Sequence, residues 1–330
     1  MYVMMVVMSS NNLNPKQREA VETLEGPVLI IAGAGAGKTK TITHRILNLI
    51  KSGVRPSEVL AITFTNKAAK EMRERVFHLI EEDKTLNIPI SFNERPFVST
   101  FHALGVHIIK ENATLLGLTR HFTIYDRGDS KRAVKDALES MGLDTKQYEP
   151  GTILNTISRE KGDGVTLASY KSHQKDFYHK MVSQVWEKYE ETLMREKSLD
   201  FDDLLLKTAS LLKTYPDVKK HYSKVWKYIH IDEYQDTNRV QYDIASLLAE
   251  ETRNICVVGD IDQNIYSWRG ADIKNMLNFE KEYPETKIIT LEENYRSTQT
   301  ILTAANNVIK KNVMRPEKNL FTKNVEGGED

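Results

Sequence analysis

Cysteine is nearly absent from this sequence, since Cys256 is the single one among 330 residues. One cysteine excludes a framework of internal disulfides and is typical of a reducing compartment, which predicts a cytoplasmic protein. Cys256 lies in the apolar run NICVVGD. We therefore expect it to be a buried packing residue rather than a nucleophile.

Long hydrophobic runs and an excess of charge of one sign are missing as well. No apolar stretch approaches the roughly 20 residues that a membrane-spanning helix needs. The opening MYVMMVVM lacks the basic start and the small-residue cleavage site of a signal peptide. The 46 basic and 46 acidic residues cancel, so composition alone predicts no nucleic-acid binding.

Short apolar or β-branched runs alternate with helical patterns along most of the chain. The runs are PVLIIA, EVLAITF, PFVST, YIHID, NICVVGD and KIITL, and the helical patterns cover 39–52, 66–81, 238–250 and 297–310. Such alternation predicts an α/β fold with a parallel sheet and helices on both faces. Between about residues 102 and 220 the strand signal vanishes, which predicts that an all-helical insertion interrupts this domain.

The stretch VLIIAGAGAGKTKTITHRIL runs from an apolar strand through alternating glycines into a helical pattern. The glycines let backbone N–H groups approach phosphate oxygens at a helix N-terminus. Lys38 would neutralise the β- and γ-phosphates, and the Thr39 hydroxyl would ligate Mg²⁺. A glycine-rich turn with an accidental lysine is the alternative, which the flanking strand and helix disfavour. The expected phosphate loop comprises Ala32, Gly33, Ala34, Gly35, Ala36, Gly37, Lys38 and Thr39, with Ala32 in place of the glycine of the strict Walker A pattern.

A second element, KYIHIDEYQD, is an apolar strand that ends in Asp232 and Glu233. In P-loop NTPases an acid at a strand tip holds Mg²⁺, and a neighbouring glutamate can orient or deprotonate the attacking water. Two acids that merely cap the next helix would give the same pattern. The phosphate loop upstream favours the nucleotide-hydrolysing interpretation.

Longer stretches then follow the motif order of one family. These are LNPKQREAV, AGAGAGKT, ITFTNKAAKEM, STFHAL, SLDFDDLL, IDEYQD, VVGDIDQNIYSWRGAD and LEENYRST. The chain resembles the first part of a superfamily 1A DNA helicase of the UvrD/Rep/PcrA type. The resemblance implies a RecA-like ATPase domain 1A over 1–101 and 221–289, a helical insertion 1B over 102–220, and the start of a second RecA-like domain over 290–330.

The resemblance also implies ATP and Mg²⁺ as cofactors and assigns contacts to them beyond the phosphate loop. Gln17 would read the adenine edge, Tyr295 would stack on the adenine, and Gln263 and Arg296 would contact the γ-phosphate. Lys40 joins the nucleotide-binding set, although the family commonly has arginine there. The implied catalytic residues are Glu233, Lys38, Arg296 and Gln263, and the implied metal ligands are Thr39 and Asp232.

The implied macromolecular partner is single-stranded DNA, including junctions between single- and double-stranded DNA. A motor on a single strand needs aromatic faces for stacking, which is worth about 1–3 kcal/mol per base in any sequence. Core packing is the alternative for each aromatic side chain, and for Phe201 the two interpretations stay equally open. By resemblance the DNA contacts are Phe64, Thr65, His102, Phe201, Tyr266, Trp268 and Arg269.

The family's motifs V and VI have no counterpart before the final NVEGGED. We therefore expect the 330-residue chain to bind ATP and single-stranded DNA, to hydrolyse ATP weakly, and not to unwind DNA alone. A missing second RecA-like domain, or a partner that supplies it, would complete a 3′-to-5′ helicase. A non-catalytic DNA-binding or interaction module is the alternative, which intact Lys38, Asp232 and Glu233 disfavour. The stretch DEYQD leaves little room for an unrelated P-loop kinase or GTPase.

Overall fold

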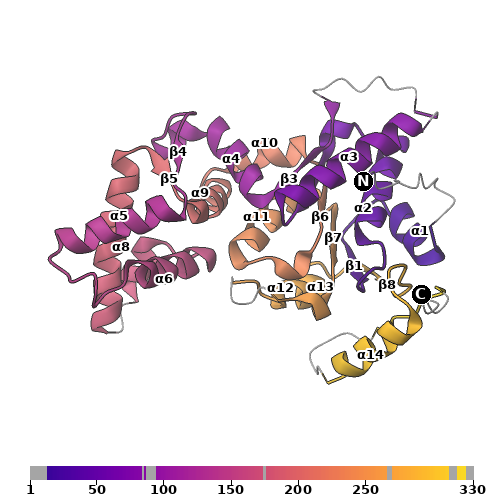
Figure 1. Ribbon diagram of the computed structural model, residues 1–330. Helices are drawn as coiled ribbons and strands as arrows, with labels where there is room; N and C mark the ends of the chain where they lie inside the picture. Colours follow the sequence, from indigo (N-terminus) through magenta and orange to yellow (C-terminus); the bar gives the residue numbers. More distant parts are fainter. Residues whose placement is uncertain are drawn as a thin grey trace, which may run out of the picture.

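The computed structural model describes residues 13–83, 85–86, 94–173, 176–265, 270–311 and 318–324. Its centre is a parallel six-stranded sheet with the strand order β3-β2-β6-β7-β1-β8 (Figure 1). The strands are β1 (Val28–Ala32), β2 (Val59–Thr63), β3 (Phe97–Thr100), β6 (Tyr228–Ile231), β7 (Ile255–Gly259) and β8 (Lys287–Leu291). Each of the six apolar runs of the sequence forms one of these strands, and the predicted parallel α/β sheet is confirmed.

Helices cover both faces of the sheet because neighbouring residues of a strand point to opposite faces. In β2, Val59 and Ala61 belong to one hydrophobic cluster, whereas Leu60 and Ile62 belong to the other. The first cluster includes side chains of α1 (Pro15–Glu22), α2 (Lys38–Lys51) and α3 (Asn66–Glu82). The second includes those of α4 (Phe101–Glu111), α9 (Phe201–Thr214), α10 (Pro216–Val225), α11 (Arg239–Ala249), α12 (Lys274–Leu277) and α13 (Phe279–Glu282).

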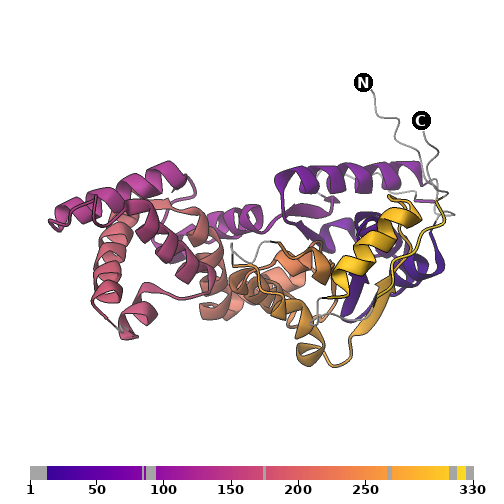
Figure 2. The ribbon, with the colours of Figure 1, turned by 60° about the horizontal axis from the view of Figure 1, so that its bottom comes forward.

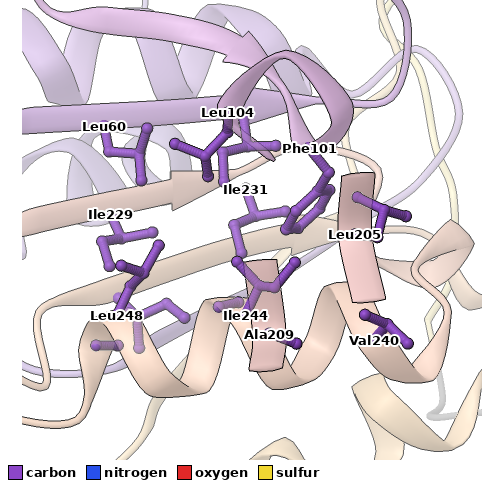
Figure 3. Packing of buried hydrophobic residues seen from close by; sticks show 14 of the residues in the cluster. Leu60, Phe101, Leu104, Leu205, Ala209, Ile229, Ile231, Val240, Ile244 and Leu248 are labelled. Carbon is purple, nitrogen blue, oxygen red and sulfur yellow. The ribbon is translucent and has the colours of Figure 1, made fainter. Parts of the chain in front are cut away.

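The second cluster fixes the position of the strand that carries the acidic pair. Ile229 and Ile231 of β6 lie beside Leu248 and Ile244 of α11, with Phe101 of α4 on the same face (Figure 3). Ile229, Ile231, Ile244 and Leu248 are fully buried. Cys256 of β7 is buried in the first cluster, as expected, and burial raises the pKa of its thiol.

The insertion has a hydrophobic core of its own, centred on residues such as Trp186 and Tyr189. Its helices are α5 (Arg127–Ser140), α6 (Pro150–Gly162), α7 (Leu167–Ser172) and α8 (Phe177–Arg195). Figures 1 and 2 show these helices at one end of an elongated molecule and the sheet at the other. Side chains of α4 and α9 belong to the sheet cluster instead. The residues that form the separate core of the insertion therefore span a shorter part of the chain than the predicted range 102–220.

Two very short strands lie at the base of the insertion. β4 (Thr123–Ile124) pairs in parallel with β5 (Ser198–Leu199), with Thr123 opposite Ser198. A strand of two residues shows no periodicity, so the sequence pattern could not reveal this pair. Within the described residues, no helix is long and apolar enough to cross a membrane.

The chain after β8 turns back over the phosphate loop. α14 (Gln299–Ile309) exposes much of its apolar surface, with Ile301 57% and Val308 72% exposed. Residues 318–324 then return toward β8, where Phe321 forms a parallel bridge with Glu293. Short 3-10 helices occur at η2 (Pro56–Glu58), η4 (Ala113–Leu116), η5 (Tyr234–Asp236) and η6 (Ile261–Gln263).

Candidate nucleotide-binding site

The loop between β1 and α2 has the conformation that its glycines predict. Gly35 and Gly37 have φ angles of 67° and 80°, in the left-handed region that favours glycine. A Cβ atom would lie 2.7 Å from Asn294 Nδ2 at Gly35 and 2.8 Å from Gln17 Nε2 at Gly37. Gly37 is the N-cap of α2, so no N-cap side chain bonds the first N–H groups of this helix. The first N–H groups of α2 therefore present the partial positive charge that suits an anion.

The charged residues of the predicted site meet at the carboxyl ends of β1 and β6. Lys38 Nζ lies 2.6 Å from Glu233 Oε2 and donates to Gln263 Oε1 at 3.3 Å. The Thr39 hydroxyl donates to Asp232 Oδ2 at 3.2 Å. The carboxyl ends of parallel strands are where α/β sheets bind their ligands. The structure thus brings together Lys38, Thr39, Asp232 and Glu233, which the sequence pattern selected, and Gln263, which the family resemblance added.

Burial gives the acidic part of this site an unusual electrostatic state. Burial, reinforced by the charge of Glu233, raises the pKa of Asp232 to about 6. Burial likewise raises the pKa of Asp236 to about 6, with Glu233 again adding to the shift. An added cation would favour the charged form of such carboxyl groups. The oxygens of Asp232 and Thr39 are also the hard donors that Mg²⁺ prefers.

Glu233 has a strained backbone conformation for a residue with a side chain. Its φ and ψ are 52° and 44°, in the left-handed region, where residues other than glycine are uncommon and often functional. Its carboxylate accepts hydrogen bonds from Lys38 and, at 2.9 Å, from Gln235 Nε2. Gln235 Oε1 accepts from the backbone N–H of Asp260 at 2.9 Å. Gln235 thereby connects the ends of β6 and β7.

The two residues predicted to contact adenine both bond the backbone of the phosphate loop. Gln17 is fully buried, and its amide donates to the Ala36 carbonyl at 3.0 Å and accepts from the Asn14 N–H at 3.1 Å. Tyr295 is 47% exposed, and its hydroxyl accepts from Asn14 Nδ2 at 2.9 Å. Its N–H donates to the Gly35 carbonyl at 3.0 Å. Asn14 therefore connects both residues.

Two residues that the sequence analysis did not assign also form contacts at this site, Asn294 with the loop and Lys318 with acidic residues after β7. Asn294 is buried and donates to the Ala34 carbonyl at 2.5 Å, while its Oδ1 accepts from the Arg296 N–H at 2.8 Å. Lys318 forms ion pairs with Asp260 and Asp262. Asn294 lies within the quoted stretch LEENYRST, whereas Lys318 lies outside every quoted motif. Their partners are distant in sequence, so local patterns gave no indication of the contacts.

Only some of the residues predicted to contact nucleic acid lie within the part of the chain that the structure describes. Phe201 is 54% exposed, which contradicts the core-packing alternative, and its ring centroid lies 5.5 Å from that of His102. Phe64 is partly buried after β2, and the Thr65 hydroxyl caps α3. Lys40 lies in the first turn of α2, where burial lowers its pKa. Tyr266, Trp268 and Arg269 lie outside the described residues.

A parallel sheet with a phosphate loop after β1 and an acidic pair after β6 defines a RecA-like P-loop protein. Comparison with known families identifies the group within that class. The model of the UvrD/REP helicase N-terminal domain matches residues 13–284, and the chain belongs to this family.

The chain is also similar to helicases called "ATP-dependent DNA helicase PcrA". It is 48% identical to that of Staphylococcus epidermidis over 283 residues, which are 86% of this chain and 38% of the relative. It is 47% identical to that of Leuconostoc citreum over 285 residues, covering 86% and 37% of the two chains. The value for Staphylococcus aureus is 48% over 284 residues, covering 86% and 38%. The match thus spans less than two fifths of each relative, and the resemblance to the first part of such a helicase is confirmed.

Proposed function

We propose that this chain forms the ATP–Mg²⁺-binding unit, and part of the single-stranded DNA track, of a 3′-to-5′ DNA helicase. The observation that carries the proposal is that five side chains meet next to the glycine loop, in which Gly35 and Gly37 have positive φ angles. These side chains are Lys38, Thr39, Asp232, Glu233 and Gln263. Membership of the helicase family supports the choice of ATP and DNA as ligands. The 3′-to-5′ direction rests on the family resemblance.

The ion pair of Lys38 and Glu233 suggests how the site responds to ATP. Phosphate oxygens would compete for the Lys38 ammonium, which now lies 2.6 Å from the Glu233 carboxylate. Glu233 would then be available to accept a hydrogen bond from the attacking water and to take up its proton. Thr39 and Asp232 would hold Mg²⁺, which neutralises charge on the phosphates when bound.

Gln263 and Arg296 are the proposed γ-phosphate contacts. The Gln263 amide is held by Asp260, whose carboxylate accepts from Gln263 Nε2 at 2.7 Å. The backbone of Arg296 is fixed by Asn294, and its side chain is exposed next to the loop. A cationic group at the γ-phosphate stabilises charge in the transition state, and losing one such arginine costs about 10³–10⁵ in rate.

We expect the 330-residue chain by itself to hydrolyse ATP weakly and not to unwind duplex DNA. The family resemblance places a second γ-phosphate arginine in motif VI and the other half of the DNA track in the second RecA-like domain, and motifs V and VI have no counterpart in these residues. Unwinding needs two domains that grip the strand in turn. A second RecA-like domain, in the same polypeptide or in a partner, is therefore part of the proposal. Single-stranded DNA and its junctions with duplex are the proposed substrates.

ATP turnover by the 330-residue chain, with and without saturating oligo-dT, tests the proposal. We expect low turnover that DNA stimulates, together with clear binding of a fluorescent ATP analogue. Glu233→Gln keeps the size of the side chain and removes the proton acceptor, so it should abolish turnover and retain analogue binding. Absence of analogue binding by the unaltered chain would contradict the proposal.

The non-catalytic module is separated from the motor by Lys38→Ala. In a motor unit this substitution should abolish turnover and weaken nucleotide binding, because the ammonium that faces the phosphates is lost. An exposed lysine on the same half of the molecule, Lys70 in α3, provides the control Lys70→Ala. If the unaltered chain binds DNA but does not hydrolyse ATP, the result would favour the non-catalytic module.

A further inference from the structure

A fully buried lysine lies where three helices of the insertion and the sheet domain meet. Lys161 is in the last turn of α6, and its side chain is 0% exposed. Its ammonium lies 2.8 Å from Asp200 Oδ2, 2.9 Å from Asp203 Oδ1 and 3.0 Å from Glu190 Oε1. Asp200 and Asp203 begin α9, and Glu190 belongs to α8. Lys161 therefore joins the C-terminus of α6 to the N-terminus of α9.

The carboxylates around Lys161 have further donors, so the cluster is a complete network. The Tyr189 hydroxyl donates to Asp200 at 2.9 Å, and the Trp186 indole N–H donates to Glu190 at 3.1 Å. Burial alone would lower the pKa of Lys161, but the nearby carboxylates outweigh it and raise that pKa well above its ordinary value. A buried charge is tolerated when it is paired in this way, although such pairs are weak evidence of a purely stabilising role.

The network fixes the turn that presents Phe201. Asp200 is the N-cap of α9 and accepts from the Asp203 N–H at 2.7 Å, while Asp203 accepts from the Asp200 N–H at 3.4 Å. On the other side of Phe201, the Asp202 carboxylate accepts from the Ser158 hydroxyl of α6 at 2.6 Å. Phe201 itself is 54% exposed beside His102. Each of its neighbours is thus held by α6 or by the helix cap.

We propose that Lys161 is a positioning residue for DNA binding, which holds the first turn of α9 so that the Phe201 ring faces solvent beside His102. This inference rests on the proposed function, because it takes Phe201 to be a base-stacking residue. An exposed phenylalanine gains nothing from core packing, so its orientation depends on the backbone turn beneath it. Lys161 reaches that turn from a different helix and needs no contact with DNA.

A double-mutant cycle between Lys161 and Phe201 tests the proposal. Binding of fluorescein-labelled oligo-dT to the 330-residue chain is measured by anisotropy for the unaltered chain, Lys161→Met, Phe201→Ala and the double variant. Loss of one stacking contact should weaken binding about 5- to 100-fold in Phe201→Ala. Lys161→Met should weaken binding by a similar factor, and the double variant should be no weaker than Phe201→Ala alone, because both changes remove the same contact.

Lys161→Met leaves buried carboxylates unpaired and can prevent folding, so Asp203→Asn is a milder second variant. It keeps the side-chain volume and leaves Lys161 with Asp200 and Glu190 as partners. Asp203→Asn should also weaken oligo-dT binding, and again only when Phe201 is present. Lys188→Met removes an exposed ion pair with Glu191 on α8 and is the matched control, for which no change is expected.

A base-stacking signal separates positioning from a general loss of stability. An oligonucleotide with 2-aminopurine, held at saturating protein, should show less quenching with Phe201→Ala and Asp203→Asn than with the unaltered chain. Equal effects of Asp203→Asn with and without Phe201, or no effect in either background, would overturn the inference. If the unaltered chain does not bind oligo-dT, the proposed function fails. If Phe201→Ala weakens binding but Lys161→Met and Asp203→Asn do not, the proposed function stands and only the role of Lys161 is rejected.

Discussion

Asn294 shows how one buried side chain connects two distant parts of the nucleotide site. It is 2% exposed, and it satisfies the Ala34 carbonyl together with the backbone N–H groups of Arg296 and Ser297. These groups belong to the phosphate loop and to the chain after β8. Because an unpaired buried polar group costs about 1–3 kcal/mol, the position of Arg296 relative to the loop depends on this amide.

Asn294→Ala is expected to lower the free energy of unfolding by about 1–3 kcal/mol, since it leaves three partly buried backbone groups without their partner. Weaker binding of a fluorescent ATP analogue should accompany this loss, because the loop loses its support. Urea unfolding and analogue titration measure the two effects. Asn307→Ala, at an exposed position of α14, is the control. Unchanged analogue affinity in a destabilised Asn294→Ala variant would contradict the link to the loop.

Asp202 predicts a pH dependence of stability that can be assigned to one residue. Burial, reinforced by the charge of Asp200, raises its pKa from 3.8 to about 6. The folded chain then holds this proton more tightly than the unfolded chain. The stability that Asp202 contributes is therefore fully present below about pH 4 and is lost as the pH rises through about 6.

Asp202→Asn removes this titration and keeps an oxygen that can accept from Ser158. Between pH 4 and pH 7 its unfolding free energy should change less than that of the unaltered chain, by about 2–3 kcal/mol. Urea unfolding of both proteins at the two pH values measures the difference, to which carboxyl groups remote from Asp202 contribute equally in both. Parallel pH profiles would show that Asp202 has no raised pKa.

At the level of elements, α1 contacts the phosphate loop through Gln17, which lies close to Gly37. Gly37 has a φ of 80°, and an added Cβ would lie 2.8 Å from Gln17 Nε2. Gln17 in turn accepts from the N–H of Asn14, the N-cap of α1, and donates to the Ala36 carbonyl. The start of α2 is therefore hydrogen-bonded to α1 through Gln17.

Gly37→Ala and Gly53→Ala form a matched pair that separates backbone strain from this contact. Both glycines have positive φ, but nothing lies within 4 Å of a Cβ added at Gly53. Each substitution should cost about 1–2 kcal/mol of stability because alanine is strained in the left-handed region. Only Gly37→Ala should also weaken binding of the ATP analogue, as measured by titration. Equal affinities of the two variants would show that the contact with Gln17 does not matter for the nucleotide.

The elements of the sheet could be predicted from the sequence because each strand is a short apolar run next to a helical pattern. The same local reasoning selected Lys38 and Thr39, which follow the glycine loop after β1, and Asp232 and Glu233, which come directly after β6. It could not predict that Gln235 connects β6 and β7. That contact depends on two strands being neighbours in the sheet, which periodicity along one strand does not encode.

At the scale of the whole molecule, the two ends have separate hydrophobic cores. Ile157 is fully buried in the insertion cluster, and Ile231 is fully buried in a sheet cluster. Proteins with separate cores often open locally in units that follow those cores. The insertion should therefore lose protection against hydrogen exchange without loss in the sheet when only its own core is weakened.

Ile157→Ala should destabilise the insertion by about 2–5 kcal/mol, as expected for a large-to-small change in a core. Amide exchange measured by mass spectrometry should rise in α5, α6 and α8, while β1, β2 and β6 keep their protection. Ile231→Ala is the reciprocal control and should raise exchange in the sheet. Equal loss of protection in both halves after Ile157→Ala would mean that the molecule unfolds as one unit.

The arrangement of the whole molecule was harder to predict than its elements. A helical pattern between residues 102 and 220 indicated an insertion, but it did not show that α4 and α9 pack on the sheet. Nor did it indicate that Lys161 bonds Asp200 and Asp203, because buried lysines leave no periodic signal. Such contacts join residues some forty positions apart, and they follow from three-dimensional packing rather than from local sequence.

The parallel pair of Thr123 and Ser198 brings the two ends of the insertion side by side. Paired strands lie about 4.8 Å apart, so the chain leaves the sheet domain and re-enters it at neighbouring points, while α6 also bonds the first turn of α9. The order of the sheet strands does not depend on that stretch, because none of the six strands lies within it. In evolutionary terms, such a base lets a domain be gained, exchanged or lost as a single block while the nucleotide site stays intact.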